Sequence, residues 1–340
     1  MEPRVIVIGS GLHKQVLGED TPLSSWDCLL HKIAEENKIK PNLPLCADDP
    51  MLAWEQLVAE QASGRGDAAK EERILKKSLC RILDDEAKEV QSEYSKDKVI
   101  AQLGQTLKQG GIHLVSLNFD HLAHAGLGKE LSVDKFLKTC RSDKIQDPAS
   151  KSESVSIKSV RMEDLKLLYG RKIVAPRTTE SCSIIWHPHG HVGRLGSLRL
   201  GMRDYGFLPQ SYFFAFEEFK KWERSVAGKL EGAKKYNKLK QALWEMDSAQ
   251  TKKSPASPAD NWVTRFMLYP VDFIGVGLSQ VEIGLRWLLV QRARNFAKVS
   301  PREVPPVIYH DAKVIHFPGV QSQPIDINPL FQERWMTVLN

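Results

Sequence analysis

The chain has 340 residues and a formal net charge of +6, with 42% hydrophobic and 26% charged residues. This balance is ordinary for a soluble globular protein, and the length suffices for one large α/β domain or two average ones. No apolar run is long enough to cross a bilayer, and the first residues lack the flanks of a signal peptide. The five cysteines form no C-x-x-C pair, which argues against a zinc ribbon. We therefore expect a cytoplasmic protein with reduced thiols and a mildly basic, solvated surface.

The amino-terminal segment has the pattern of a buried strand followed by a glycine turn. Arg4 to Ile8 (RVIVI) is an apolar run without polar alternation, which predicts a central strand of a parallel sheet. Gly9, Ser10 and Gly11 follow at once, where a nucleotide's phosphates can approach backbone N–H groups in an α/β fold. The third glycine of a G-x-G-x-x-G motif is missing, because the sequence continues with Leu12-His13-Lys14. A plain strand-to-loop turn therefore stays open as the alternative.

Long stretches of the chain have helical periodicity. Between residues 26 and 109 apolar residues recur at spacings of three and four, which predicts a helical insertion whose aromatic and leucine residues form core. A loop at Ser63 to Asp67 separates two of its helices. Phe207 to Met246 is again helical and charged on one side, and Gln250 to Asp260 resembles a linker. Val281 to Phe296 predicts a further helix.

A second buried strand, Ile112 to Leu117, ends in the polar cluster Asn118-Phe119-Asp120. Asn and Asp directly after a buried strand lie where ligands bind in open α/β sheets. An Asx turn or a helix cap explains the same residues equally well. Arg141 to Ser159 is rich in Ser, Lys and Asp and has no periodicity, so we expect a mobile surface loop there.

The segment Cys182 to Tyr205 carries the densest group of chemically active side chains. Ile184 to Trp186 predicts a short buried strand that ends in three histidines within five residues, His187, His189 and His191. Three imidazoles at the end of a strand, beside small residues, indicate a site more than a surface loop. Several further strands are expected toward the carboxyl end: Val271 to Val276, Val307 to His310 and Val314 to Phe317.

A metal-dependent hydrolase is one interpretation of the histidine cluster. Alternating histidines resemble metal ligands on a strand, and Asp120, His121 and His124 offer further candidates. Pro188 and Gly190 interrupt a regular extended run, however, which weakens the strand argument.

The polar clusters are expected to meet in one crevice. Strands that alternate with helices form a parallel sheet, and parallel strands place their carboxyl ends along one edge. Four clusters follow such strands: GSG, NFD, HPHGH and VGLS. Their convergence predicts a ligand site better than any one of them does.

The order and spacing of these motifs resemble a sirtuin-like domain, and most closely the bacterial branch found in anti-phage defence systems. The motifs are the early GSG, NFD after the second strand, the HG dipeptide and a late GxGLS before a tryptophan-containing helix. The resemblance covers nearly the whole chain. It implies one α/β domain over residues 1–340, with a Rossmann-like parallel sheet and helical insertions at about 26–109 and 207–262.

The resemblance also implies how a dinucleotide is held. It places the early glycine motif at the phosphates and the late one against the adenosine half. Two features depart from the family: the paired CxxC zinc module is absent, which argues against an acyl-lysine groove, and His13 replaces the serine that usually closes the first motif. The residues assigned to these contacts are Gly9, Ser10, Gly11, Gly275, Gly277 and Ser279.

For catalysis, the resemblance implies Asn118 and Asp120 beside the nicotinamide ribose and His189 as the catalytic histidine. A carboxamide such as Asn118 can hold a ribose hydroxyl or the attacking water, and a neutral histidine can accept a proton near neutral pH. Asp120 either stabilises developing positive charge or caps the following helix. From the residues alone, His187 and His191 remain alternatives as the base.

The expected activity is that of an NAD⁺ glycohydrolase that depletes NAD in anti-phage defence and needs no zinc. The alternatives are an NAD-dependent protein deacylase, a metal-dependent hydrolase that uses the HPHGH histidines, and a nucleotide sensor without catalysis. The resemblance further implies a homo-oligomer and an operon-encoded partner, such as a hexameric DNA-translocating ATPase or an Argonaute-like protein. No membrane association is expected.

Overall fold

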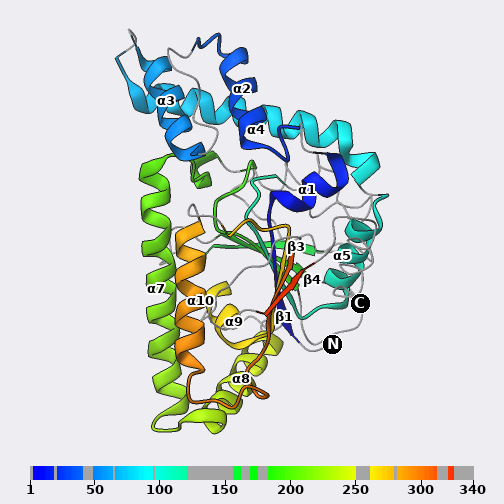
Figure 1. The fold of residues 1–340 in the computed structure, drawn as a ribbon, viewed down its shortest axis with the longest axis vertical. Helices are drawn as coiled ribbons and strands as arrows, with labels where there is room; N and C mark the ends of the chain where they lie inside the picture. The colour runs from blue at the N-terminus through cyan, green and yellow to red at the C-terminus, as the bar shows by residue number, and fades with distance from the viewer. Residues whose placement is uncertain are drawn as a thin grey trace.

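The structure is a computed structural model in which helices surround an eight-stranded sheet (Figure 1). It describes residues 3–18, 21–40, 49–63, 66–94, 96–120, 122, 156–161, 169–174, 183–193, 195–249, 261–278, 282–311 and 321–324. The strands are β1 (Arg4–Ile8), β2 (Ile112–Ser116), β3 (Ser156–Arg161), β4 (Tyr169–Val174), β5 (Ser183–His187), β6 (Val271–Ile274), β7 (Val307–Asp311) and β8 (Gln321–Pro324). The helices are α1 (Ser10–Leu17), α2 (Trp26–Glu36), α3 (Pro50–Ala62), α4 (Ala68–Tyr94), α5 (Lys98–Gln109), α7 (Met202–Ala227), α8 (Gly232–Ala249), α9 (Trp262–Leu268) and α10 (Ile283–Asn295), with a short 3₁₀ helix η3 (Leu195–Ser197).

The strand order is β3-β4-β5-β2-β1-β6-β7-β8. The strands from β5 to β8 in this order pair in parallel. At the β5 edge, β4 pairs antiparallel with both β5 and β3. Counted along the chain, the parallel strands have the order 3-2-1-4-5-6, which is that of a doubly wound, Rossmann-like sheet. The order reverses between β1 and β6, and ligands of such sheets bind outside the carboxyl ends of the strands at this switch point.

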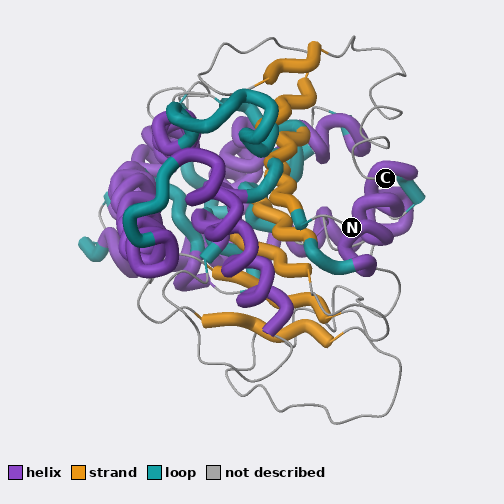
Figure 2. Tube along the Cα trace, turned by 90° about the horizontal axis from the view of Figure 1, so that it is seen from below, coloured by secondary structure: helices purple, strands orange, loops and turns teal. Residues whose placement is uncertain are grey.

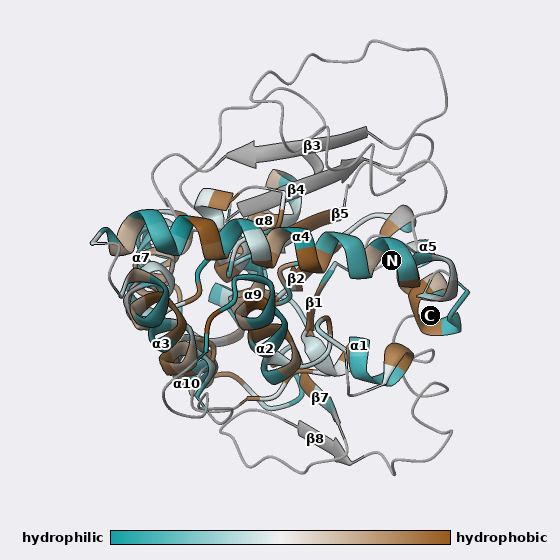
Figure 3. Cartoon of the chain, turned by 90° about the horizontal axis from the view of Figure 1, so that it is seen from above, coloured by the Kyte–Doolittle hydropathy of each residue, from teal (hydrophilic) through white to brown (hydrophobic). Residues whose placement is uncertain are grey.

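The two faces of the sheet are covered by different helices. Ile6 and Ile8 belong to a core cluster with residues of α1 to α5, while Val5 and Val7 pack with α7 to α10. All four side chains are fully buried or nearly so, as expected for a strand covered on both faces. Figure 2 shows the strands as one twisted layer with helices on both sides. In Figure 3, hydrophilic and hydrophobic stretches alternate along α4 and α7, as expected of helices with one face on the core.

Polar side chains fix where several helices begin. Oγ of Ser25 accepts a hydrogen bond from the Cys28 N–H at the start of α2. Asp97 accepts hydrogen bonds from two backbone amides at the start of α5, and Asn261 caps α9. Such caps each contribute about 1 kcal/mol because they satisfy amides that the helix leaves unpaired.

Most of the elements expected from the sequence are present. The strands predicted at 4–8, 112–117, 184–186, 271–276 and 307–310 all form, and the predicted insertions contain α2 to α5, most of α7, and α8. Val314 to Phe317 lies outside the described residues, as do the 250–260 linker and residues 141–155. Among the described residues, no helix is both long and apolar enough to cross a bilayer.

Two predictions about local structure need correction. The loop expected over 141–159 is wrong for residues 156–159, which belong to β3 and pair with β4. Backbone pairing defines this strand, and its sequence, SIKSVR, lacks the apolar run by which the central strands are recognised. The helix expected from Phe207 begins earlier, at Met202, and continues through Pro209.

Candidate functional site

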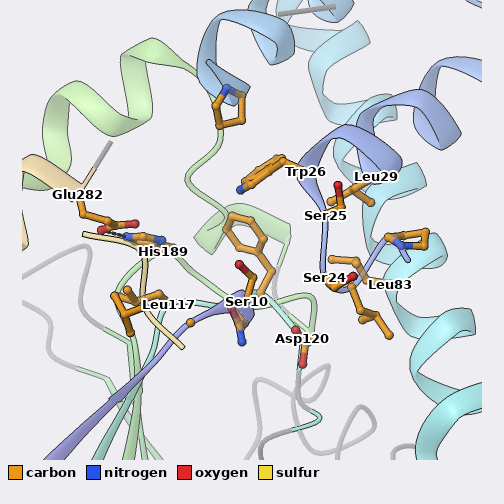
Figure 4. A pocket seen from close by; sticks show the side chains of 18 residues that line it. Ser10, Ser24, Ser25, Trp26, Leu29, Leu83, Leu117, Asp120, His189 and Glu282 are labelled. Carbon is orange, nitrogen blue, oxygen red and sulfur yellow. Dashed lines mark ion pairs between the residues drawn. The ribbon is translucent and has the colours of Figure 1, made fainter. Parts of the chain in front are cut away.

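A pocket of about 300 Å³ opens at the carboxyl edge of the sheet, beside the switch point between β1 and β6 (Figure 4). Its volume is at the lower end of the range usual for ligand pockets. The loops after β1, β2, β5 and β6 form one wall, and the start of α2 with parts of α3 and α4 forms the other. The lining residues are Gly9, Ser10, Pro22, Leu23, Ser24, Ser25, Trp26, Leu29, Pro50, Leu83, Leu117, Asn118, Phe119, Asp120, His189, Val276, Gly277 and Glu282.

Six of the nine site residues named from the sequence therefore line this one cavity. The other three are placed differently: Gly11 and Gly275 lie behind the lining, and Ser279 falls outside the described residues. The strand ends do converge as the parallel topology predicts.

Gly11 and Gly275 have a packing role at the switch point. The Gly11 N–H donates to the Gly275 carbonyl at 2.9 Å, and a Cβ on Gly11 would lie 2.7 Å from that oxygen. Gly275 has a φ of +60°, and a Cβ there would lie 2.3 Å from the Leu12 nitrogen. Since real Cβ atoms do not approach backbone so closely, these glycines let the β1–α1 turn rest directly on the end of β6. The pocket itself is bordered by Gly9 and Ser10.

The loop after β5 holds His189 at the pocket. The side chain of His189 is 3% exposed, and the His189 carbonyl accepts a hydrogen bond from the Arg199 N–H at 2.9 Å. Gly190 adopts a φ of +91°, where a Cβ would lie 2.1 Å from the Ser197 carbonyl oxygen. The tight turn that the glycine permits brings the loop against η3 and fixes the direction in which His189 leaves the backbone.

The other two histidines of the motif make different contacts. The ring of His187 lies edge-on to that of His191, with centroids 4.7 Å apart, and its Nδ1 lies 3.3 Å from the Asn118 carbonyl oxygen. Nδ1 of His191 accepts a hydrogen bond from the Gly193 N–H at 2.9 Å. Of the three, His189 is the one that lines the pocket. Within the described ranges, no three His, Cys, Asp or Glu side chains are grouped so as to hold a metal ion.

A buried polar network supports the floor of the pocket. His13, on α1 and fully buried, places Nε2 2.8 Å from Oδ2 of Asp120 and 3.0 Å from Nδ2 of Asn118. Its Nδ1 lies 2.9 Å from the Tyr94 hydroxyl. Burial, with the charge of Asp120 next in importance, holds the pKa of Tyr94 well above its usual value, so the phenol stays protonated.

The protons of this network can be assigned from its acceptors. The Asp120 carboxylate only accepts, so His13 donates from Nε2–H, and the Tyr94 hydroxyl donates to the remaining lone pair on Nδ1. The Nε2–H of His13 and the Nδ2–H of Asn118, both donors, would then face each other. A half-turn of the Asn118 amide, which exchanges its nitrogen and oxygen, turns Oδ1 toward Nε2–H and resolves the conflict. His13 thereby fixes the orientation of both polar side chains that follow β2.

Asp120 forms a local turn and also lines the pocket. Its Oδ1 accepts a hydrogen bond from the Leu122 N–H at 2.8 Å, which is an Asx-type turn. Its Oδ2 faces His13, and the residue also lines the pocket. Because protein groups engage both oxygens, Asp120 stabilises the site's geometry as well as contributing negative charge to it.

Glu282, which the sequence did not single out, lies beside His189 at one side of the pocket (Figure 4). Its Oε2 lies 3.6 Å from Nε2 of His189, and its side chain is 14% exposed. Burial raises the pKa of the Glu282 carboxyl, against the opposing effect of His189. No pattern marks this glutamate in the sequence, because its importance arises only from the packing of α10 beside the loop after β5.

The helical insertion supplies the apolar wall. Trp26 packs edge-on against Phe119, with ring centroids 5.4 Å apart, and Phe119 in turn lies 6.4 Å from the ring of His189. The sequence assigned Trp26 to the core, but it is only partly buried and lines the cavity. An amphipathic helix pattern identifies the inward face of a helix without showing whether that face meets core or a cavity.

The site thus joins aromatic and apolar surface to a carboxamide, two carboxylates and an imidazole, next to the start of α1. A scan against protein-family models finds no match to this chain, and searches of the curated proteins and of the solved structures find no similar protein.

Proposed function

We propose that the protein is an NAD⁺ glycohydrolase, which cleaves NAD⁺ to nicotinamide and ADP-ribose. The observation that carries the proposal is that Asn118 and His189, which follow different strands, line one pocket at the switch point of a Rossmann-like sheet. Dinucleotides bind at this place in folds with this strand order.

The residue types suit the cleavage of an N-glycosidic bond. Expulsion of neutral nicotinamide leaves an oxocarbenium-like ribose, so the site must position the sugar, admit one water and accept its proton. Asn118 can hold a ribose hydroxyl or the water without adding charge, and His13 fixes its direction. His189 can accept the proton, and a general base of this kind contributes ~10²–10⁴-fold to the rate.

The other end of the pocket suits a pyrophosphate. Ser10 is the first residue of α1 and lines the pocket. The amino end of a helix carries a partial positive charge and directs N–H groups outward, so it stabilises bound phosphate without a lysine. Trp26 and Phe119 offer aromatic surface for a planar base.

The sirtuin-like resemblance extends the proposal to the cell. We infer a defence effector that lowers the NAD⁺ level when it is activated, working as a homo-oligomer with an operon-encoded partner. The lack of a paired CxxC zinc module keeps protein deacylation in second place.

The test is product analysis with NAD⁺. The wild-type protein, alone and with the product of its neighbouring gene, should release nicotinamide and ADP-ribose in equal amounts. Asn118→Ala and His189→Ala should each lower the rate by about 100-fold or more, as expected for loss of a positioning or general-base group. Thermal unfolding of each variant reports whether the fold is kept. Folded variants with wild-type turnover, or a wild-type protein that leaves NAD⁺ intact under both conditions, would refute the proposal.

A further inference from the structure

Glu282 has the placement of a functional group at the start of α10. It precedes α10 as the N-cap residue, yet its side chain makes no capping hydrogen bond. Glutamate is a poor N-cap residue, and burying most of a carboxylate is costly unless the charge is paired. The side chain is instead turned into the pocket, where its Oε2 faces Nε2 of His189.

The distance between the carboxylate of Glu282 and the imidazole of His189 allows both groups to accept a proton from the same water molecule. At 3.6 Å, Oε2 and Nε2 are further apart than a direct hydrogen bond allows. A water molecule or hydroxyl beside the pair can lie within hydrogen-bond reach of both atoms at once. The carboxylate also stabilises the imidazolium that forms when His189 takes a proton, as opposite charges in a poorly solvated site attract strongly.

We propose that Glu282 is a further catalytic residue, which together with His189 receives the proton of the water that attacks the ribose. This role rests on the proposed NAD⁺ hydrolysis. In the step, the water oxygen bonds to C1′ of the nicotinamide ribose while the bond from C1′ to the nicotinamide nitrogen breaks. The electron pair of that bond leaves with nicotinamide, which departs neutral. The proton of the water passes to the His189–Glu282 pair and from there to solvent.

A nucleophile other than water distinguishes a proton-accepting role of Glu282 from a purely structural one. A pyridine such as 3-acetylpyridine attacks C1′ through a nitrogen that has no proton to lose, so exchange of nicotinamide for the pyridine needs no base. Hydrolysis does need one. Loss of the proton acceptor should therefore impair hydrolysis far more than exchange, whereas damage to the pocket should impair both alike.

The experiment measures both products of the full-length protein, incubated with NAD⁺ and 3-acetylpyridine, in whichever of the two conditions above supports nicotinamide release. The variants are Glu282→Gln, which keeps the shape but cannot accept a proton, and Glu282→Asp, which keeps a carboxylate. Glu303→Gln, at an exposed turn after α10, is the matched control. The ratio of the two products comes from the same folded molecules, so it is unaffected if a variant folds less completely.

For Glu282→Gln we expect ADP-ribose formation to fall by about 100-fold while the ratio of exchange to hydrolysis rises at least about tenfold. Glu282→Asp should recover part of the hydrolysis, and Glu303→Gln should match wild type. An equal fall in both products, or unchanged hydrolysis, would overturn the role of Glu282 while leaving NAD⁺ hydrolysis standing. If wild type forms neither product, the proposed function itself falls.

Discussion

At the scale of single residues, His13 is the side chain on which the pocket floor most depends. It lies in α1, two residues after Gly11, and reaches Asp120, Asn118 and Tyr94 through its two ring nitrogens. Each of these partners is buried, so removal of the His13 side chain would cost each of them a hydrogen bond that water cannot easily replace. We therefore interpret His13 as a positioning residue that acts on the site through Asn118 and Asp120.

Replacement of His13 by alanine tests this interpretation. His13→Ala should lower the free energy of unfolding by about 2–4 kcal/mol, through the lost packing and the unpaired polar groups. It should also lower NAD⁺ turnover at least about tenfold, because Asn118 is no longer held. Tyr94→Phe removes only the hydroxyl on the far side of the ring and should cost about 1 kcal/mol with turnover nearly kept. Equal effects of the two variants on turnover would show that the network is purely structural.

Glu282 makes a prediction about pH. Because burial raises its pKa above the ordinary 4.5, the folded protein keeps the proton at pH values where the unfolded chain has released it. Stability from this group is therefore present below pH 4.5 and is lost as pH rises through the folded-state pKa. Glutamine has no such proton, so the unfolding temperature of Glu282→Gln relative to wild type should be higher at pH 7 than at pH 4. A difference that is constant or shrinks toward neutral pH contradicts the assignment.

At the scale of elements, the site depends on how closely the β1–α1 turn approaches the end of β6. Gly11 and Gly275 provide this approach, and Gly9 adds to it with an N–H that donates to the Ile274 carbonyl at 3.2 Å. The glycines that the sequence offered for binding phosphate thus serve first to join the two strands on either side of the switch point.

Gly275 and Gly277 lie in the same loop after β6, and comparing alanine substitutions at the two shows whether close packing or only backbone flexibility requires a glycine there. Gly275→Ala introduces a Cβ that would lie 2.3 Å from the Leu12 nitrogen in a left-handed backbone conformation. It should destabilise the protein by at least about 1–2 kcal/mol. Gly277→Ala meets no atom within 4 Å and should leave the free energy of unfolding within about 0.5 kcal/mol of wild type. Denaturant unfolding of both variants measures the contrast, and similar midpoints would contradict it.

The helical insertion shows what one sequence can and cannot predict at this scale. Its helices were expected from apolar spacing, because amphipathic periodicity reports which face is buried. That Trp26 borders a cavity was not predictable, since it depends on where α2 lies relative to Phe119 on another segment. β3 was missed for a related reason. Its backbone pairs with β4, but its sequence, SIKSVR, has no apolar run that would mark it as a strand.

At the scale of the whole molecule, the sheet order explains why distant motifs could be grouped from the sequence. Apolar runs at β1, β2, β5 and β6 predicted parallel strands, and parallel strands bring Ser10, Asn118 and His189 to one edge. What topology could not supply is the side-chain geometry within that edge. The contact of Glu282 with His189 and the links of His13 to Asn118 and Asp120 follow from the packing of α10 and α1, which no short motif encodes.

The central claim is that one dinucleotide fills the pocket, with its nicotinamide ribose between Asn118 and His189. A crystal structure of the His189→Ala variant with NAD⁺ tests it most directly, because this variant should bind NAD⁺ without cleaving it. We expect the pyrophosphate beside Ser10 at the start of α1 and C1′ of the nicotinamide ribose facing Asn118, residue 189 and Glu282. NAD⁺ bound elsewhere on the molecule, or bound here with that ribose directed away from Asn118, would contradict the account.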